Sequence, residues 1–202
     1  VEDNAVAVLF DDRADDVQDL LAQPKSVVDI QEGGAYSGTL CLRVPVAMPQ
    51  GQYPIRHGFF FLDTMHDWNF EIVEHPAAPG HYRYLQFAWK ALSDHTTGIG
   101  LRLGSGGSAD ADGDGHQENL HYVAVNAGVS HFPTTPQVTE IMIPEDEFPH
   151  GDWKLVRIDL WAQTAGKLKR ITQIGLRTDG GGALFDQILL GRTEADLDEW
   201  LA

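Results

Sequence analysis

Short segments in which apolar and polar residues alternate run through almost the whole chain, and this pattern restricts the fold more than any other feature. Clusters of Gly, Pro, Asp and Asn separate the segments, as is typical of β-sandwiches and β-barrels. Helical patterns are confined to 14–22 and to 194–201, which follows an N-cap signal at Thr193. We therefore expect an all-β fold with a short C-terminal helix. Strands are predicted at 6–10, 26–30, 39–46, 55–63, 69–73, 82–92, 98–103, 120–126, 139–143, 153–160, 171–177 and 183–190.

The length and composition indicate one folded unit. All-β sandwiches of about 200 residues commonly form a single domain, and the 202 residues include 43% hydrophobic residues, enough for a core. The chain contains neither a long linker nor an internal repeat. We therefore expect residues 1–202 to form a single sandwich module. Because the chain opens without an initiator Met or a signal sequence, we interpret it as a mature or excised domain.

The charge excludes several classes of partner. The formal net charge is −16, from 30 acidic and 14 basic residues, which argues against binding to nucleic acid or to anionic membranes. No apolar run reaches the roughly 18 residues that a membrane span needs.

Cys41 is the single cysteine, so an intramolecular disulfide and a zinc-cysteine cluster are both excluded.

Acidic residues occur in both terminal strand segments. Asp186 lies among apolar residues in the last strand, where a buried carboxylate needs a cation or several hydrogen bonds. The first strand ends in Asp11 and Asp12. We predict that the two strands are neighbours and that these carboxylates share a structural Ca²⁺. The alternative is that Asp186 only accepts backbone N–H groups in a turn.

A second candidate calcium site is the acidic segment 108–118. Asp110, Asp112 and Asp114 alternate and are followed by a glycine, so that one tight loop can direct several oxygens at a hard cation. The segment begins like an EF-hand loop, but position 12 is His121 and no helices flank it. We predict a lone Asp-rich calcium loop, and the alternative is a solvated acidic loop.

Alternation also assigns polar side chains to one face of several strands. Aromatic rings that lie beside planar hydrogen-bonding groups suit sugar rings, and arginines in an acidic protein can bind uronate or sulfate. The alternative is an ordinary solvated sheet face with cross-strand Arg–Asp pairs. The candidate ligand-binding residues on these strand faces are Tyr84, Gln86, Arg102, Arg157 and Trp161.

The segment around Trp68 is another candidate for sugar binding. Trp68 is predicted to be a stacking platform, with His66 and Asn69 bonding the hydroxyl groups. The alternative is that Trp68 packs on the edge of the sandwich. Trp89 and Trp153 are assigned to the core from their alternation, and Trp200 is expected to pack the terminal helix onto the body.

Several motifs resemble galactose-binding-like domains. They are GGAYSGTLCLRV at 33–44, LFDD at 9–12, FDQI at 185–188, YLQFAWK at 84–90 and WKLVRIDL at 153–160. The resemblance implies a jelly-roll sandwich with antiparallel strands, and a structural Ca²⁺ held by Asp11 or Asp12 together with Asp186. Many members of this family are carbohydrate-binding modules of secreted multidomain proteins, and others bind no sugar. No sugar-contacting residue carries over from the family.

Enzyme motifs are absent: the chain has no Gly-x-Ser-x-Gly, Walker or dinucleotide-binding pattern. We expect a non-catalytic carbohydrate-binding module for a polysaccharide, an acidic one being an option, in a secreted or periplasmic protein with neighbouring domains. The first alternative is a non-sugar accessory domain of such a protein. The second is a jelly-roll polysaccharide lyase that uses Tyr84, Tyr122, His121 and Arg157.

Overall fold

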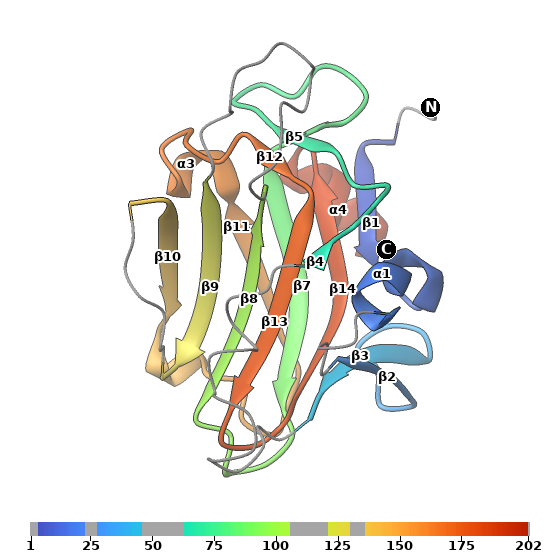
Figure 1. Cartoon of the computed structure of the whole chain (residues 1–202), viewed down its shortest axis with the longest axis vertical. Helices are drawn as coiled ribbons and strands as arrows, with labels where there is room; N and C mark the ends of the chain where they lie inside the picture. The colour runs from blue at the N-terminus through green and yellow to red at the C-terminus, as the bar shows by residue number, and fades with distance from the viewer. Residues whose placement is uncertain (1–3, 23–27, 46–62, 106–120, 130–135, 202) are drawn as a thin grey trace.

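Two β-sheets packed face to face form the body of the protein in the computed structural model, which describes residues 4–22, 28–45, 63–105, 121–129 and 136–201 (Figure 1). Sheet A has the order β11-β7-β14-β3-β2, with β1 also paired to β14. Its strands are β1 (Val6–Phe10), β2 (Asp29–Glu32), β3 (Leu40–Val44), β7 (Tyr84–Ala91), β11 (Lys154–Asp159) and β14 (Ala183–Gly191).

Sheet B has the order β10-β9-β8-β13-β4, and a small third sheet has the order β12-β5-β6. The strands of sheet B are β4 (Asp63–Thr64), β8 (Gly98–Gly104), β9 (Tyr122–Gly128), β10 (Val138–Ile143) and β13 (Gln173–Asp179). Those of the third sheet are β5 (Phe70–Ile72), β6 (His81–Tyr82) and β12 (Arg170–Ile171). The helices are η1 (Ala14–Val17), α1 (Gln18–Ala22), η2 (Glu145–Glu147), α3 (Leu160–Gln163) and α4 (Glu194–Leu201).

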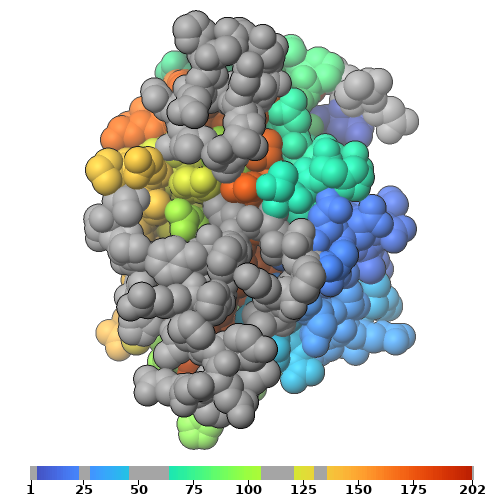
Figure 2. Space-filling view, in the orientation of Figure 1, coloured from blue at the N-terminus to red at the C-terminus, as the bar shows by residue number. Residues whose placement is uncertain are grey.

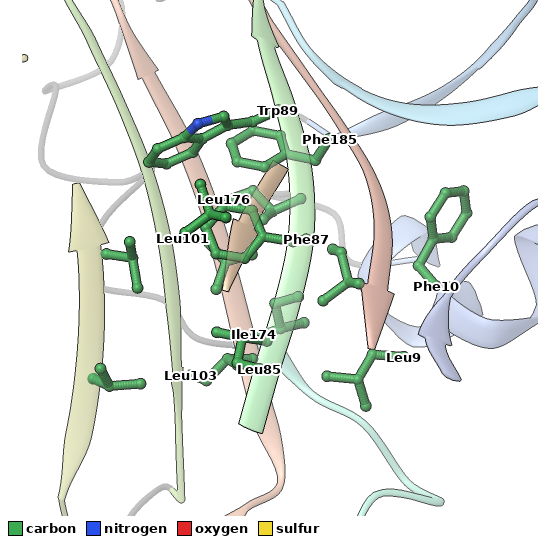
Figure 3. Close-up of a cluster of buried hydrophobic side chains, with 14 of the residues drawn as sticks. Leu9, Phe10, Leu85, Phe87, Trp89, Leu101, Leu103, Ile174, Leu176 and Phe185 are labelled. Carbon is green, nitrogen blue, oxygen red and sulfur yellow. The ribbon is translucent and has the colours of Figure 1, made fainter. Parts of the chain in front are cut away.

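The hydrophobic core lies between sheets A and B. Phe87 and Trp89 of β7 meet edge to face at a centroid distance of 5.0 Å, and Trp89 packs on Phe185 of β14 at 6.3 Å. Burial of each such side chain stabilises the folded state by about 1.5–3 kcal/mol. Figure 3 shows how side chains from both sheets interleave there, the labelled ones being Leu9, Phe10, Leu85, Phe87, Trp89, Leu101, Leu103, Ile174, Leu176 and Phe185.

The predicted fold class is confirmed: the chain is an all-β sandwich, and α4 covers the residues expected for the C-terminal helix. Two strand pairs differ from the antiparallel expectation, since β9 pairs with β10 and β5 with β6 in parallel. The strand predicted at 153–160 ends one residue early. Asp159 accepts the backbone N–H of Ala162 at 3.0 Å and thereby caps α3, so Trp161 lies in a helix and not on a strand face.

Strand β14 changes its partner halfway along one edge. Residues 183–185 pair with β3, whereas residues 188–191 pair with β1, and β7 follows the other edge. The predicted pairing of the first and last strands is therefore confirmed. At the change of partner the ladder is irregular, and Gln187 adopts a positive φ of 47°. The N-terminal elements thus gather along one side of the sandwich, where they are blue in Figure 2.

Candidate functional site

The strand-face residues predicted to bind a ligand lie on opposite sides of the sandwich. Gln86 and Arg157 are paired across β7 and β11 of sheet A, whereas Arg102 belongs to β8 of sheet B. Their neighbours Leu85 and Leu101 point into the shared core, so the polar side chains point outward, away from each other. These residues therefore cannot form a single binding face.

A polar network lies on the outer face of sheet A. Arg157 donates from Nε and Nη2 to Gln86 Oε1 at 3.1 and 2.7 Å, and Gln86 Nε2 donates to Gln187 Oε1 at 3.3 Å. Arg157 Nη1 also forms an ion pair with Asp198 of α4 at 2.8 Å. Because Gln86 is fully buried, it connects structural elements and is not placed to touch a ligand. Arg157 remains partly exposed at the edge of this network.

Helix α4 docks on the same outer face. Thr193 and Asp196 cap its N-terminus reciprocally, with the Asp196 N–H donating to Thr193 Oγ1 and the Thr193 N–H donating to Asp196 Oδ2. Leu197 packs directly over Gly191, where an added Cβ would lie 2.6 Å from Leu197 Cγ. Trp200 Nε1 donates to Asp11 Oδ2 at 3.2 Å. The expectation that Trp200 packs the helix onto the body therefore agrees with the structure.

The carboxylates of the terminal strands are engaged by hydrogen-bond donors. Asp186 Oδ2 accepts the N–H groups of Tyr36 and Ser37 at 2.7 and 3.0 Å, and its Oδ1 accepts the N–H of Gln187 at 2.7 Å. Burial raises the pKa of Asp186 to about 6, although the three N–H groups act to lower it. Asp11 Oδ1 accepts Ser37 Oγ–H at 2.6 Å. Asp12 Oδ1 accepts the N–H groups of residues 39 and 40.

This arrangement does not fit the expected calcium bridge. N–H and O–H groups surround Asp186 and Asp11, whereas a calcium ion needs six to eight oxygen ligands. Within the described ranges, no group of three or more His, Cys, Asp or Glu side chains could hold a metal ion. The backbone N–H alternative accounts for Asp186. The second candidate loop, with Asp110, Asp112 and Asp114, lies outside the described residues.

A group of aromatic and apolar side chains borders these contacts, three of them exposed and the fourth, Trp153, half-buried. The rings of Tyr36 and Trp153 lie 6.0 Å apart at an angle of 59°, and Trp153 Nε1 donates to the carbonyl oxygen of Gly34 at 3.1 Å. Leu155 is the next residue of β11 that faces outward. The exposed fractions of Tyr36, Leu155 and Trp200 are 37%, 39% and 44%. We call Tyr36, Trp153, Leu155 and Trp200 the aromatic patch.

Hydrogen bonds through Asp11 connect the Tyr36 end of the aromatic patch with Trp200. Ser37, next to Tyr36, donates to Asp11, and Asp11 in turn accepts from Trp200. Sequence reasoning missed Tyr36 and assigned Trp153 to the core. Tyr36 lies in the Gly-rich loop between β2 and β3, and Trp153 precedes β11, so neither has the period-2 pattern that marks a strand face. The one feature of the sequence that could have indicated an exposed aromatic ring is the position of Tyr36 in a turn-forming segment between glycines.

The predicted platform at Trp68 is wrong. Trp68 is 8% exposed, belongs to the hydrophobic core and packs on Phe70 at a centroid distance of 5.8 Å. It therefore packs within the sandwich, which was the alternative interpretation. Asn69 is exposed, and its Oδ1 accepts a hydrogen bond from Arg170.

His66 is exposed between two carboxylates. Its Nδ1 lies 2.5 Å from Asp19 Oδ2 and its Nε2 lies 2.8 Å from Asp67 Oδ2. The hydrogen bond to Asp19 raises the pKa of His66 above its usual value. Both ring nitrogens thus have partners within the protein, and the buried Trp68 offers no ring surface beside them for a sugar.

Tyr84 and Trp161 are half-buried, and a cation lies over each ring. Arg83 Cζ is 5.5 Å from the centroid of Tyr84, and Lys169 Nζ is 4.4 Å from that of Trp161. Trp161 also packs closely on Gly166, where an added Cβ would lie 2.9 Å from the indole. Internal contacts therefore occupy ring surfaces that sugar stacking would require.

The outer face of sheet B has its own polar network. The Arg102 guanidinium lies 4.5 Å from the ring centroid of Tyr122, and Asn126 Nδ2 donates to Glu140 Oε1 at 3.0 Å. Tyr122 packs over Gly104, which leaves room for its ring: a Cβ at this position would come within 2.2 Å of the ring. Burial lowers the pKa of Arg102. Arg102 thus packs among protein groups on the side opposite the aromatic patch.

The residues of the lyase alternative do not converge. Tyr84 and Arg157 lie on sheet A, whereas Tyr122 lies on sheet B. His121, which precedes β9, is buried, and its Nε2 lies 2.8 Å from Thr139 Oγ1. A base and an arginine that act on one uronate must share one cleft. Tyr84 and Arg157 are thus on a different sheet from Tyr122 and its neighbour His121, and the four residues form no such constellation.

Comparison with known proteins finds distant likeness among solved structures. No family model and no curated protein matches the chain. Among solved structures it is similar to a crystal structure of a family 30 carbohydrate-binding module, with a TM-score of 0.42 and 14% sequence identity. The match covers 83% of this chain and 74% of the other. Every helix among the described residues is too short or too polar to cross a lipid bilayer.

Proposed function

We propose that this chain is a non-catalytic carbohydrate-binding module that binds a polysaccharide at the aromatic patch. The pair formed by the exposed Tyr36 and the half-buried Trp153, with ring centroids 6.0 Å apart on the outer side of sheet A, carries the proposal. Large apolar groups exposed together on a protein surface mark interaction sites. Aromatic rings beside hydrogen-bonding groups suit sugars, because the ring stacks on the C–H face of the sugar while polar groups bond its hydroxyls.

Polar groups border the aromatic patch on the side of α4. Arg157 and Asp198 form an ion pair there, and the Asp198 side chain is 66% exposed. Asp11 and Ser37 bond each other between Tyr36 and Trp200. Guanidinium, carboxylate and hydroxyl groups are donors and acceptors for sugar hydroxyls. Because contacts within the protein already hold these groups in place, they lose little conformational entropy when a sugar binds.

The parent protein and the metal are further parts of the proposal. We expect the module to belong to an exported protein with neighbouring domains and to carry structural calcium. The expectation of an exported parent protein rests on the family resemblance of the sequence motifs. The calcium expectation rests on the spacing of Asp110, Asp112 and Asp114.

The test is retention on insoluble and immobilised polysaccharides, neutral and acidic, in buffer with Ca²⁺ and again with EDTA. We expect retention on one glycan class, and Tyr36→Ala or Trp153→Ala should weaken binding at least fivefold, which corresponds to about 1 kcal/mol. Trp161→Ala is the matched control, because it removes a half-buried indole that is covered by Lys169. Thermal melts confirm that each variant is folded.

Two results would contradict the proposal. Retention that survives both Tyr36→Ala and Trp153→Ala would exclude the aromatic patch as the binding surface. Absence of retention on every glycan would favour the accessory domain, and the exposed Leu155 and Trp200 would then be the first residues to test for a protein partner.

A further inference from the structure

Two basic side chains flank one leucine on the outer face of sheet A. Leu184 of β14 is opposite Arg43 of β3 on one side and opposite Lys90 of β7 on the other. Residues directly opposite each other in a sheet point to the same face. Ala183 and Phe185 point into the core, so Arg43, Leu184 and Lys90 point outward. We call Arg43 and Lys90 the basic pair.

The long side chains of the basic pair can reach toward each other over Leu184. Two strand spacings, about 9.5 Å in all, separate the two backbones. Leu184 is only 2% exposed and forms an apolar floor between them. Arg43 is exposed and Lys90 is half-buried. Neither forms an ion pair with any described residue, although the chain has 30 acidic residues for its 14 basic ones.

Among the described residues, the two acidic side chains that the ladders place beside the basic pair form no ion pair with it. Asp29 of β2 is opposite Arg43 in the ladder, but no ion pair joins them. Asp186 lies two residues beyond Leu184, and three backbone N–H groups engage its carboxylate. A pair of cations without a bonded carboxylate is a suitable site for an external anion.

The basic pair borders the aromatic patch. Lys154 is opposite Trp89 in the ladder of β7 and β11, so the preceding residue, Trp153, lies beside Lys90. Trp153 also bonds Gly34 in the loop that leads into β3, the strand of Arg43. A ligand that stacks on Trp153 therefore has the basic pair within reach.

From this juxtaposition we infer that the glycan is acidic, with a carboxylate or sulfate group held by Arg43 and Lys90. The inference rests on the proposed function, since it places the sugar ring on Tyr36 and Trp153. Arg43 supplies paired N–H donors that match two oxygens of the anion, and Lys90 supplies a compact point charge. The neutral alternatives of the same polymer lack the group that these two side chains recognise.

The test compares a uronate polymer, the same polymer with its carboxyl groups reduced to alcohols, and a sulfated polymer. We expect the wild-type protein to bind at least one of the two anionic polymers tenfold or more tightly than the carboxyl-reduced one. Arg43→Gln and Lys90→Gln should each weaken that binding roughly tenfold or more, as loss of a charge-assisted hydrogen bond does. Lys167→Gln, which removes an exposed charge beyond α3, is the matched control and should change nothing.

The outcomes separate this inference from the proposed function. Equal binding of the uronate polymer and its reduced form, unaffected by Arg43→Gln and Lys90→Gln but lost in Trp153→Ala, would overturn the acidic ligand and leave the module intact. Binding of no polymer at all would overturn both. Preference for the uronate or for the sulfated polymer identifies which anionic group the basic pair holds.

Discussion

The carboxylate of Asp186 accepts the backbone N–H of Tyr36 at 2.7 Å and thereby joins two residues that are 150 positions apart in the chain. The contact lies where β14 exchanges β3 for β1 as its neighbour. Where a strand changes its neighbour in a sheet, some of its backbone groups have no partner in an adjacent strand. Asp186 accepts the N–H of Gln187 at this change of partner and those of Tyr36 and Ser37 in the loop between β2 and β3, and so it fixes the loop that carries Tyr36 onto the outer face of sheet A.

We therefore expect Asp186→Ala to lower the free energy of unfolding by about 2 kcal/mol, because three N–H groups lose their acceptor at a buried site. Urea unfolding measures this change. The control, Asp94→Ala, removes an exposed carboxylate and should stay within about 0.5 kcal/mol of the wild type. An Asp186→Ala protein as stable as the wild type would show that these hydrogen bonds contribute no net stability.

The sequence predicted the strands well because alternation is a local signal. Leu85, Phe87 and Trp89 point inward as their period of two requires. Membership in a sheet depends on contacts between distant segments, which alternation does not contain. Arg102 and Arg157 have the same apolar-polar pattern in the sequence, yet they lie on opposite faces of the sandwich.

The aromatic patch was harder to predict than the strands. Tyr36 and Trp153 stand outside the regular strands, and Tyr36 reaches the outer face only because its loop folds back to Asp186. The capping of α3 by Asp159, which removed Trp161 from the expected strand face, also depends on side-chain geometry. Site residues carried by loops and caps therefore need the tertiary structure.

The ionisation of Asp159 makes the free energy of unfolding depend on pH. Burial tends to raise the pKa of Asp159, but hydrogen bonds from Arg83 and from the N–H of Ala162 outweigh it, and the pKa lies below its usual value of 3.8. A lowered pKa in the folded state means that the ionised carboxylate stabilises the fold above pH 3.8. That contribution is lost as the pH falls through the pKa of the folded state.

Asp159→Asn should therefore cost about 2 kcal/mol at pH 7, from the weakened Arg83 pair and the altered cap. The difference from the wild type should shrink steadily below about pH 3.8, the usual pKa of the group. Unfolding by urea at pH 7, 5, 4 and 3 measures it, with the exposed Asp152→Asn as the control. A constant difference over this pH range would exclude Asp159 as the titrating group.

The docking of α4 depends on the fit between Gly191 and Leu197. Gly191→Ala places a Cβ 2.6 Å from Leu197 Cγ, and we expect a loss of about 1–3 kcal/mol from overpacking. Leu197→Ala leaves a cavity and should cost about 2–5 kcal/mol. In the double variant the new methyl group enters that cavity, so the combined loss should be smaller than the sum of the two single losses. Strict additivity would show that the two positions do not contact each other in solution.

Removal of calcium tests the remaining metal prediction. If the segment with Asp110, Asp112 and Asp114 binds Ca²⁺ only in the folded protein, EDTA should lower the melting temperature, because a ligand at 100 times its Kd stabilises by about 2.7 kcal/mol. The triple variant D110N/D112N/D114N should melt at the same temperature with and without EDTA, whereas Asp11→Asn should keep the EDTA effect. An EDTA effect that persists in the triple variant but vanishes in Asp11→Asn would place the cation at the terminal strands, against the hydrogen bonds seen there. A wild-type melt that EDTA does not change would mean that no removable calcium stabilises the fold.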